Sequence, residues 1–305
     1  MHILVTGGAG FIGSHLVRLL LSNGHSVTAV DDVSTGQVDN ITAFLDHPKF
    51  RFDRADIVTW AGLQDAAQAA DMIYHLAAVV GVRRVLDDPI RVLSTNIVGT
   101  ERLLGAMSGG RQPPRLMFAS SSEVYGFNPS PRIAETDQLV YTSGNWTRRS
   151  YAVSKLAGEH FASAYAREHG MQIISLRFFN IIGPRQRGEY GMVLPNFVHQ
   201  AVRGLPITVY GDGNQTRSFC DVRDAVQMMA RLAGTNPFPG EIVNLGNDEE
   251  ITINDLAELV RRRANSSSTI QHLSHADGYG EHFDDAANRR PDLTLLKTMV
   301  EFCPR

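Results

Sequence analysis

Residues 6–14, Thr6-Gly7-Gly8-Ala9-Gly10-Phe11-Ile12-Gly13-Ser14, decide the fold of this chain. They follow the apolar run Ile3–Thr6, which predicts a strand, and they open the amphipathic pattern Phe11–Asn23, which predicts a helix. Three glycines stand where a tight strand-to-helix turn must bring backbone against a pyrophosphate, and the helix N-terminus supplies amide donors. The stretch therefore predicts a dinucleotide site with contacts from Gly7, Gly10, Phe11, Ile12 and Gly13.

The pattern around this turn repeats along the first half of the chain. Short apolar runs predict further strands at Ser26–Val30, Met72–His75, Arg115–Ala119 and Gln172–Leu176, and helical patterns between them cover Pro89–Met107 and Arg149–His169. Continuously apolar strands that alternate with helices indicate a parallel sheet covered on both faces. We expect an α/β chain with a doubly wound parallel sheet of the Rossmann type.

The composition of the chain changes after Asn180, where Gly, Pro and Arg become frequent. At 305 residues the chain is long enough for one large domain and a smaller partner. Helix patterns at Asp221–Leu232 and Asn254–Arg263 and strand patterns at Ile207–Tyr210 and Glu241–Leu245 complete the prediction. We expect residues 1–178 and about 215–247 to form the cofactor domain, and residues 179–214 and 248–305 to form a smaller α/β substrate lobe.

Composition excludes several classes of function. The formal charge of −3 gives no reason to expect a nucleic acid or an anionic membrane as partner. The two cysteines, Cys220 and Cys303, are too few for a disulfide framework, and their spacing does not suggest a metal site. No apolar run is long enough to span a membrane, and the first residues already form a strand, so we expect a cytoplasmic protein without a leader.

Acidic and small residues at the ends of later strands extend the expected cofactor site. Asp31, eighteen residues after Gly13, stands where an acid binds the adenosine ribose hydroxyls, and we prefer it to the adjacent Asp32. A carboxylate there repels a 2′-phosphate, so the cofactor is expected to be NAD rather than NADP. Further expected contacts are Asp56 and Ile57 beside the adenine and the small-residue stretch Leu76, Ala77 and Ala78.

A tyrosine and a lysine four residues apart provide the expected chemistry. Tyr151 and Lys155, within Tyr151-Ala152-Val153-Ser154-Lys155, lie on one face of a predicted helix. A tyrosine is normally neutral at pH 7, but a neighbouring ammonium and a positive nicotinamide favour the phenolate and make a usable base. The serine run at Ser120–Ser122 follows a predicted strand, at the sheet edge where ligands of such folds bind.

These motifs, in this order, resemble the extended short-chain dehydrogenases/reductases that act on nucleotide sugars, the NAD-dependent epimerase/dehydratase family. Arg177-Phe178-Phe179-Asn180 and Gly183-Pro184-Arg185 extend the resemblance over nearly the whole chain. The resemblance implies that Ser122 bonds the reacting oxygen, Tyr151 takes its proton, and Lys155 tunes Tyr151 and holds the nicotinamide ribose. It implies oxidation of the sugar at C4 by bound NAD, followed by return of the hydride.

The resemblance also implies further contacts. On the cofactor side these are Asn96, Ser120 and Phe178. On the side of the nucleotide diphosphate of a UDP-sugar they are Asn180, Leu194, Asn196, Val209, Tyr210, Arg217, Arg289 or Arg290, and Asp292. Arginine suits a diphosphate because its planar fork makes paired, charge-assisted hydrogen bonds.

Glu123 is the residue that bears on the reaction. Ser-Glu-Val-Tyr-Gly at 122–126 resembles UDP-glucuronate decarboxylases, whereas a 4,6-dehydratase has an aspartate where this chain has Ser122. Oxidation at C4 makes the C5 carboxylate a β-keto acid that loses CO₂, and Ser122 and Tyr151 stabilise the resulting charge on O4. We favour decarboxylation, with Glu123 close to C5, over 4-epimerisation, and both over dehydration.

Other readings stay open. Ala78-Val79-Val80-Gly81-Val82 and Gly183-Pro184-Arg185-Gln186 resemble 4-epimerases, in which Glu123 would only organise the site. A dehydrogenase that releases NADH and a regulator that binds NAD without chemistry are the remaining alternatives. The resemblance further implies a homodimer in which the helices at Pro89–Met107 and Arg149–His169 form a four-helix bundle.

Overall fold

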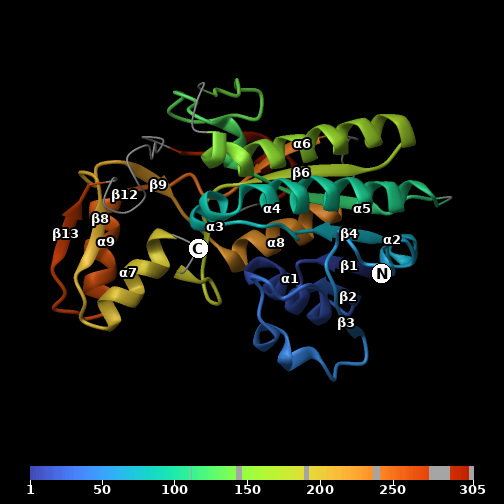
Figure 1. Cartoon of the computed structure of the whole chain (residues 1–305), viewed down its shortest axis with the longest axis horizontal. Coiled ribbons are helices and arrows are strands. Elements are labelled where there is room, and N and C mark those ends of the chain that lie inside the picture. The colour runs from blue at the N-terminus through green and yellow to red at the C-terminus, as the bar shows by residue number, and fades with distance from the viewer. Residues whose placement is uncertain (111, 142–145, 189–191, 236–240, 275–288, 302–305) are drawn as a thin grey trace.

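The computed structural model describes residues 1–110, 112–141, 146–188, 192–235, 241–274 and 289–301 (Figure 1). Seven parallel strands form the central sheet in the order β11-β6-β5-β4-β1-β2-β3. Their bounds are β1 His2–Thr6, β2 Ser26–Asp31, β3 Phe50–Arg54, β4 Met72–His75, β5 Arg115–Ser121, β6 Ile173–Phe178 and β11 Glu241–Leu245. This confirms the doubly wound α/β fold.

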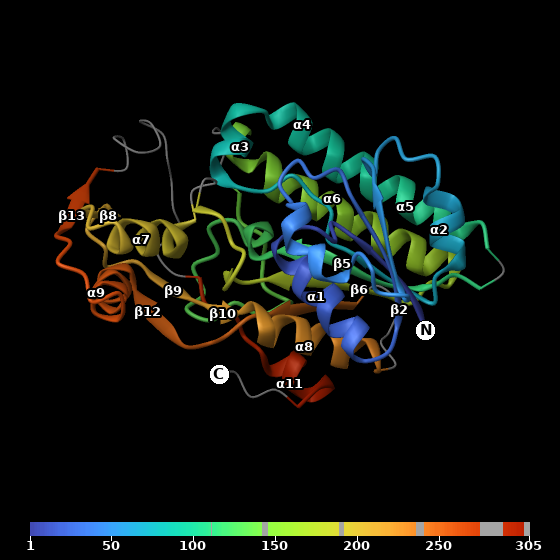
Figure 2. The same ribbon diagram turned by 90° about the horizontal axis from the view of Figure 1, so that it is seen from below.

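Helices cover both faces of the sheet, so strand side chains are buried on both sides (Figures 1 and 2). One face carries α1 (Phe11–Ser22), α8 (Val222–Ala233) and α11 (Thr294–Met299). The other face carries α2 (Leu63–Ala69), α5 (Gly99–Ser108) and α6 (Trp146–His169), with α3 (Val82–Asp87) and α4 (Pro89–Leu93) packed on α6. Short 3-10 turns lie at Val38–Asn40, Thr42–Phe44 and Ser122–Tyr125.

The helix expected at Pro89–Met107 is interrupted. The chain forms α4, then one π-helical turn at Ser94–Val98, then α5. Asn96 lies in the middle of this turn, and its side chain is buried. Since π-turns often mark functional sites, the interruption points to a role for Asn96 other than helix packing.

A second group of elements forms its own core at one end of the sheet (Figure 2). It contains α7 (Val193–Val202), β8 (Ile207–Tyr210), α9 (Ile253–Arg263) and β13 (Ile270–Leu273), with β8 and β13 parallel. β9 (Thr216–Ser218) pairs antiparallel with β12 (Glu250–Thr252), and β7 (Ile181–Ile182) pairs with β10 (Cys220–Asp221). We refer to this group of elements as the second lobe.

The structure differs from the expected division of the chain at two places. Leu293, Leu296 and Val300, expected in the second lobe, belong to the core of the main sheet because α11 packs against β11. Residues 216–218, expected in the cofactor domain, pair with β12 of the second lobe. Cys303 lies outside the described residues.

Candidate active site

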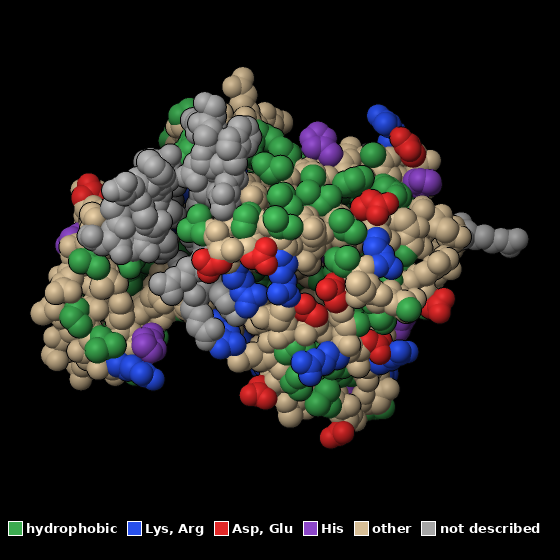
Figure 3. Space-filling view, in the orientation of Figure 1, with side chains coloured by type: hydrophobic (Ala, Val, Ile, Leu, Met, Phe, Trp, Pro, Cys, Tyr) green, Lys and Arg blue, Asp and Glu red, His purple; other side chains and the backbone are tan. Residues whose placement is uncertain are grey.

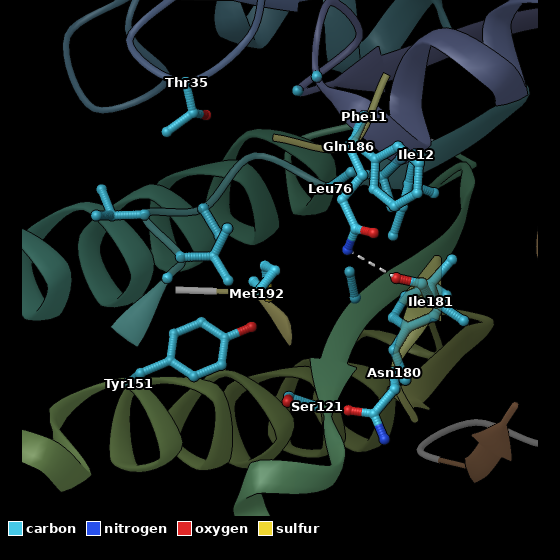
Figure 4. Close-up of a pocket in the computed structure, with 18 of the residues that line it drawn as sticks. Phe11, Ile12, Thr35, Leu76, Ser121, Tyr151, Asn180, Ile181, Gln186 and Met192 are labelled. Carbon is cyan, nitrogen blue, oxygen red and sulfur yellow. Dashed lines mark hydrogen bonds between the residues drawn. The ribbon is translucent and has the colours of Figure 1, made fainter. Parts of the chain in front are cut away.

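A cavity of about 470 Å³ lies between the carboxyl ends of the parallel strands and the second lobe. Gly7, Asp31, Leu76, Ser121 and Phe178, which line it, come from the ends of β1, β2, β4, β5 and β6 or follow them directly. Figure 4 shows Tyr151, Ser121 and Asn180 on one side of the cavity and Phe11, Ile12 and Leu76 on another. The position follows from the fold, because parallel strands present all their carboxyl ends at one edge.

The glycine turn at the start of α1 has no room for a side chain at Gly7 or Gly13. Gly7 has φ +73°, and a Cβ there would lie 2.8 Å from the amide nitrogen of Ala77. A Cβ on Gly13 would lie 2.1 Å from the carbonyl oxygen of Gly7. The turn and the end of β4 therefore form a close backbone cradle at a helix N-terminus, which fits a pyrophosphate.

Both candidate ribose acids line the cavity, but they are held differently. Asp31 is buried, and its carboxylate accepts hydrogen bonds from Ala9 N at 3.0 Å and Val33 N at 2.8 Å. Burial raises the pKa of Asp31, and the backbone donors oppose this rise. Asp32 is more exposed and pairs with Arg91 at 3.7 Å. Asp31 thus ties β2 to the glycine turn and is fixed in place by that turn.

His75 at the end of β4 links the cofactor strands to the helix layer. Its Nδ1 lies 2.7 Å from Thr6 Oγ1, and its Nε2 lies 3.1 Å from Thr100 Oγ1. Because the Thr100 hydroxyl donates to Asn96 O, Nε2 donates and Nδ1 accepts. Burial, assisted by the charge of Lys155, lowers the pKa of His75 to about 3, so the ring is neutral.

Tyr151 and Lys155 on α6 both face the cavity. Lys155 Nζ donates to Ala119 O at 2.7 Å and lies 5.9 Å from the centre of the Tyr151 ring. Burial lowers the pKa of Lys155 to about 7, and the charge of Glu159 opposes this change. Burial raises the pKa of Tyr151, so the phenol needs a cation to serve as a base.

The serine that interacts with Tyr151 is Ser121. A hydrogen bond with the Ser121 side chain lowers the pKa of Tyr151 against the effect of burial. Ser121 also accepts from Glu123 N at 3.2 Å, which begins the 3-10 turn after β5. Ser122, the expected partner of the reacting oxygen, lines the same cavity one position later and is buried.

Glu123 and Arg289 form an ion pair on the wall of this cavity. The Arg289 side chain is 9% exposed and that of Glu123 is 21% exposed. Arg289 thus lies beside Glu123, whose charge acts on Tyr151, rather than only at the nucleotide end where the resemblance placed it. The pair brings a cation and a carboxylate together in the cavity.

Most expected site residues line the cavity, and five do not. Asn96 accepts from Val79 N at 2.8 Å and donates to Val79 O and Ser154 Oγ, so it pins the loop after β4 to α6. Val209 is fully buried in the core of the second lobe. Arg290 pairs with Glu250 at 3.4 Å, and Asp292 accepts from Thr294 N at 2.7 Å. Asn196 lies in the first turn of α7, outside the lining.

Several lining residues were not expected. They include Ser34, Thr35, Ser121, Gln186, Met192, Thr208, Gln215 and Phe219. The alternation of β8 could have indicated Thr208, since it shares a face with the expected Tyr210. Gln186, whose amide donates to Ile181 O at 3.0 Å (Figure 4), follows the noted Gly183-Pro184-Arg185 turn. Ser121 belongs to the serine run noted in the sequence, and the remaining positions carry no local signal.

Within the described residues, no group of His, Cys, Asp and Glu could hold a metal ion. No helix in the same part of the chain has the length and apolar character needed to cross a bilayer.

Comparison with known proteins agrees with this geometry. The family model described as "NAD dependent epimerase/dehydratase family" matches residues 3–246. A UDP-N-acetyl-alpha-D-glucosaminuronate decarboxylase of Bacillus cytotoxicus is 37% identical over 306 residues, covering 99% of this chain and 92% of the relative. UDP-glucuronic acid decarboxylase 1 of Danio rerio is 37% identical, and the match covers 99% of this chain and 68% of that relative. The structure of UDP-glucuronic acid 4-epimerase from Bacillus cereus, in complex with UDP-glucuronic acid and NAD, superimposes with a TM-score of 0.88 at 31% identity. That match covers 100% of this chain and 94% of the epimerase.

Proposed function

Because the chain belongs to the NAD-dependent epimerase/dehydratase family, we propose that it decarboxylates a UDP-hexuronic acid. The observation that carries this proposal is the Glu123–Arg289 pair beside Tyr151. A guanidinium binds carboxylates through its planar fork, and an uncharged hexose has no carboxylate with which it could form such a charge-assisted pair. The relatives named UDP-glucuronic acid and UDP-N-acetylglucosaminuronate decarboxylases supply the candidate substrates.

The cradle described above fits NAD. Gly7 and Gly13 allow the turn to close tightly, so that its backbone amides could hold the pyrophosphate. Asp31 would hold the adenosine ribose, and Lys155 would hold the nicotinamide ribose. When bound, NAD accepts a hydride from the sugar C4 and later returns it, so the overall reaction has no net redox change. We further propose that the main sheet holds this cofactor and that the second lobe, through Leu194 and Tyr210, holds the nucleotide.

The side chains of the cavity supply the proton transfers. Tyr151 takes the proton of the C4 hydroxyl, with Lys155 stabilising the phenolate. In the 4-keto sugar the carboxylate leaves C5 as CO₂, the bonding electrons move to O4, and the Ser121 and Tyr151 hydroxyls stabilise this oxyanion. Glu123 takes up a proton from solvent once Arg289 binds the substrate carboxylate, and delivers this proton to C5. Tyr151 returns its own proton to O4 after the hydride is returned. The balance is one hexuronate and one proton converted to one pentose and one CO₂.

The test is incubation of the purified protein with UDP-glucuronic acid under argon, followed by proton NMR of the anomeric region and assay of CO₂. UDP-xylose with stoichiometric CO₂ is expected, and Tyr151→Phe is the inactive control. UDP-N-acetylglucosaminuronic acid is tested in parallel to identify the group at C2. UDP-galacturonic acid without CO₂ would contradict decarboxylation.

The second candidate is 4-epimerisation, favoured by the likeness to UDP-glucuronic acid 4-epimerase. It uses the same Tyr151, Ser121 and Lys155 but needs room for the 4-keto sugar to turn over. Arg289 would then hold the C5–carboxylate bond close to the plane of the C4 ketone, so that its electrons do not pass to O4 and the carboxylate is kept. The same incubation separates the two candidates, since only one releases CO₂.

We also propose a homodimer built from α4, α5 and α6. Figure 3 shows hydrophobic side chains gathered over these helices, and Ile90, Val98 and Val153 are exposed there at 76%, 41% and 43%. Burial of such a patch in a second copy removes apolar surface from water. Light scattering should give twice the mass of one chain, and Ile90→Asp should shift it toward the monomer.

A cytoplasmic location is proposed on the cysteine content. Cys220 is a free, buried thiol whose pKa burial raises to about 12, so it is unsuited to disulfide exchange. Fractionation of cells that express the chain tests this location.

A further inference from the structure

A buried carboxylate lies one helical turn beyond the catalytic lysine. Glu159 follows Lys155 by four residues on α6, and its side chain is only 4% exposed. It accepts two hydrogen bonds from Arg177 of β6, from Nε at 2.9 Å and from Nη2 at 2.7 Å. It also accepts a short hydrogen bond from the hydroxyl of Ser120. A buried charge is costly unless it is paired and hydrogen-bonded, and Glu159 meets both conditions through Arg177 and Ser120.

The contacts of Glu159 reach the strand that carries the active site. Ser120 stands on β5 between Ala119, whose carbonyl accepts from Lys155 Nζ at 2.7 Å, and Ser121, which interacts with Tyr151. Glu159 therefore fastens β5 to α6 at the one position that lies between both contacts. A shift of Ser120 would move the acceptor of Lys155 and the partner of Tyr151 together.

Glu159 also supplies charge. Lys155 is 4% exposed, and its ammonium is costly at that depth. The groups that face it are Tyr151 and Glu159 on α6, Phe118 and the Ala119 carbonyl on β5, and the neutral His75 on β4. Among them Glu159 is the anion, and its charge raises the pKa of Lys155 against the effect of burial.

We propose that Glu159 is a positioning residue for Lys155. Glu159 holds the end of β5 against α6 at the active site and keeps the lysine ammonium charged. Arg177 takes part by fixing the Glu159 carboxylate through both of its oxygens. The proposal rests on the proposed function only in treating Lys155 as a working part of the site. The charge of the lysine itself can be measured without any substrate.

The chain offers a direct measurement because it contains three lysines, Lys49, Lys155 and Lys297. In NAD-loaded protein labelled with [ε-¹³C]lysine, three resonances are followed from pH 5 to pH 11, and Lys155→Met assigns one of them. Glu159→Gln should lower the titration midpoint of Lys155 by about one pH unit or more, since a nearby opposite charge shifts a pKa by roughly that much. Lys49 and Lys297 should not move.

Matched variants separate charge from folding. Glu168→Gln removes a carboxylate from the same helix at an exposed position, 63% accessible, and should leave Lys155 unchanged. Glu159→Asp keeps the charge and should recover most of the midpoint. Should Glu159→Gln unfold because Arg177 stays buried and charged, Glu159→Gln/Arg177→Gln removes both charges and is measured instead. A folded Glu159→Gln or double variant with the wild-type Lys155 midpoint overturns the proposal.

Activity gives a second readout. For the UDP-sugar that is turned over, the alkaline limb of kcat should move to lower pH in Glu159→Gln, because Lys155 loses its proton earlier, while KM stays within about threefold. A uniform drop of kcat at every pH with an unmoved Lys155 resonance would mean a purely structural role and overturn the charge argument. If no UDP-sugar is converted, the proposed function fails, and the NMR titration still decides the role of Glu159.

Discussion

Arg289 forms an ion pair with Glu123 inside the cavity although 166 positions separate the two residues in the sequence. Neither has a local signal that links it to the other, and the packing of the chain brings them together. If Arg289 binds the substrate carboxylate, Arg289→Met should lower kcat/KM for UDP-glucuronic acid by about 30-fold or more, since loss of one partner of a buried charge pair costs about 2–5 kcal/mol. Calorimetric affinity for UDP-glucose, which has no carboxylate, should change by less than about threefold. An equal loss for both nucleotides would contradict carboxylate recognition.

Glu123→Gln is expected to separate oxidation from the later steps. The amide retains size but cannot deliver the proton to C5, so the absorbance of reduced NAD at 340 nm should still rise on addition of substrate. Formation of UDP-xylose should fall by about 10²–10⁴-fold, the usual contribution of a general acid. Unchanged product formation would assign Glu123 to scaffolding.

Replacement of Ser121 and replacement of the adjacent Ser122 are expected to have different effects. Ser121→Ala should lower kcat by about 10²–10³-fold because it removes a donor to the reacting oxygen. Ser122→Ala should cost less than about tenfold. Initial rates of the two variants with the same substrate give the answer, and the reverse order would return the role to Ser122.

Asp31 is expected to set the preference for NAD. Asp31→Asn removes the charge and keeps an acceptor for Ala9 N or Val33 N, so the affinity for NADP should rise at least about tenfold relative to NAD. Asp32→Asn, at the more exposed neighbour, is the control and should leave the ratio nearly unchanged. Titration of cofactor-free protein with each dinucleotide provides the two dissociation constants.

His75 should make stability depend on pH. Its pKa is about 3 in the folded chain and about 6.5 when unfolded. As the pH falls, the unfolded state therefore binds the extra proton before the folded state does. The contribution of His75 to the free energy of unfolding is fully present above about pH 6.5 and is lost as the pH falls toward 3. Between pH 7 and pH 5 the loss from this residue is about 2 kcal/mol. Urea unfolding should show that His75→Gln loses about that much less over the interval than the wild type.

The fold could be predicted because its signals are local. The glycine turn, the apolar strands and the strand–helix alternation each occupy a few neighbouring residues, and the sheet follows from them. Tyr151 and Lys155 were visible for the same reason, since four residues place two side chains on one helix face.

The remaining features depend on packing that a linear pattern does not contain. Asn96 has the chemistry of a ligand contact, but the π-turn directs its amide to Val79 and Ser154. Within the serine run only the geometry of the strand end distinguishes Ser121 from Ser122. The expected boundary placed Leu293, Leu296 and Val300 in the second lobe because apolar residues fit either core. The contact of α11 with β11 instead packs them in the core of the main sheet.

The strand order β11-β6-β5 has a consequence for biosynthesis. β11 joins the sheet beside β6 only after the chain has left the sheet to build α7, β8 and β9. During synthesis on the ribosome, β6 is therefore an edge strand whose outer backbone donors and acceptors are unpaired until β11 is made. Such an edge can pair with other chains. Closing this long-range pair late makes folding slow relative to proteins with local contacts. The nascent chain consequently passes through an aggregation-prone interval that ends when residues 241–245 are released and docked.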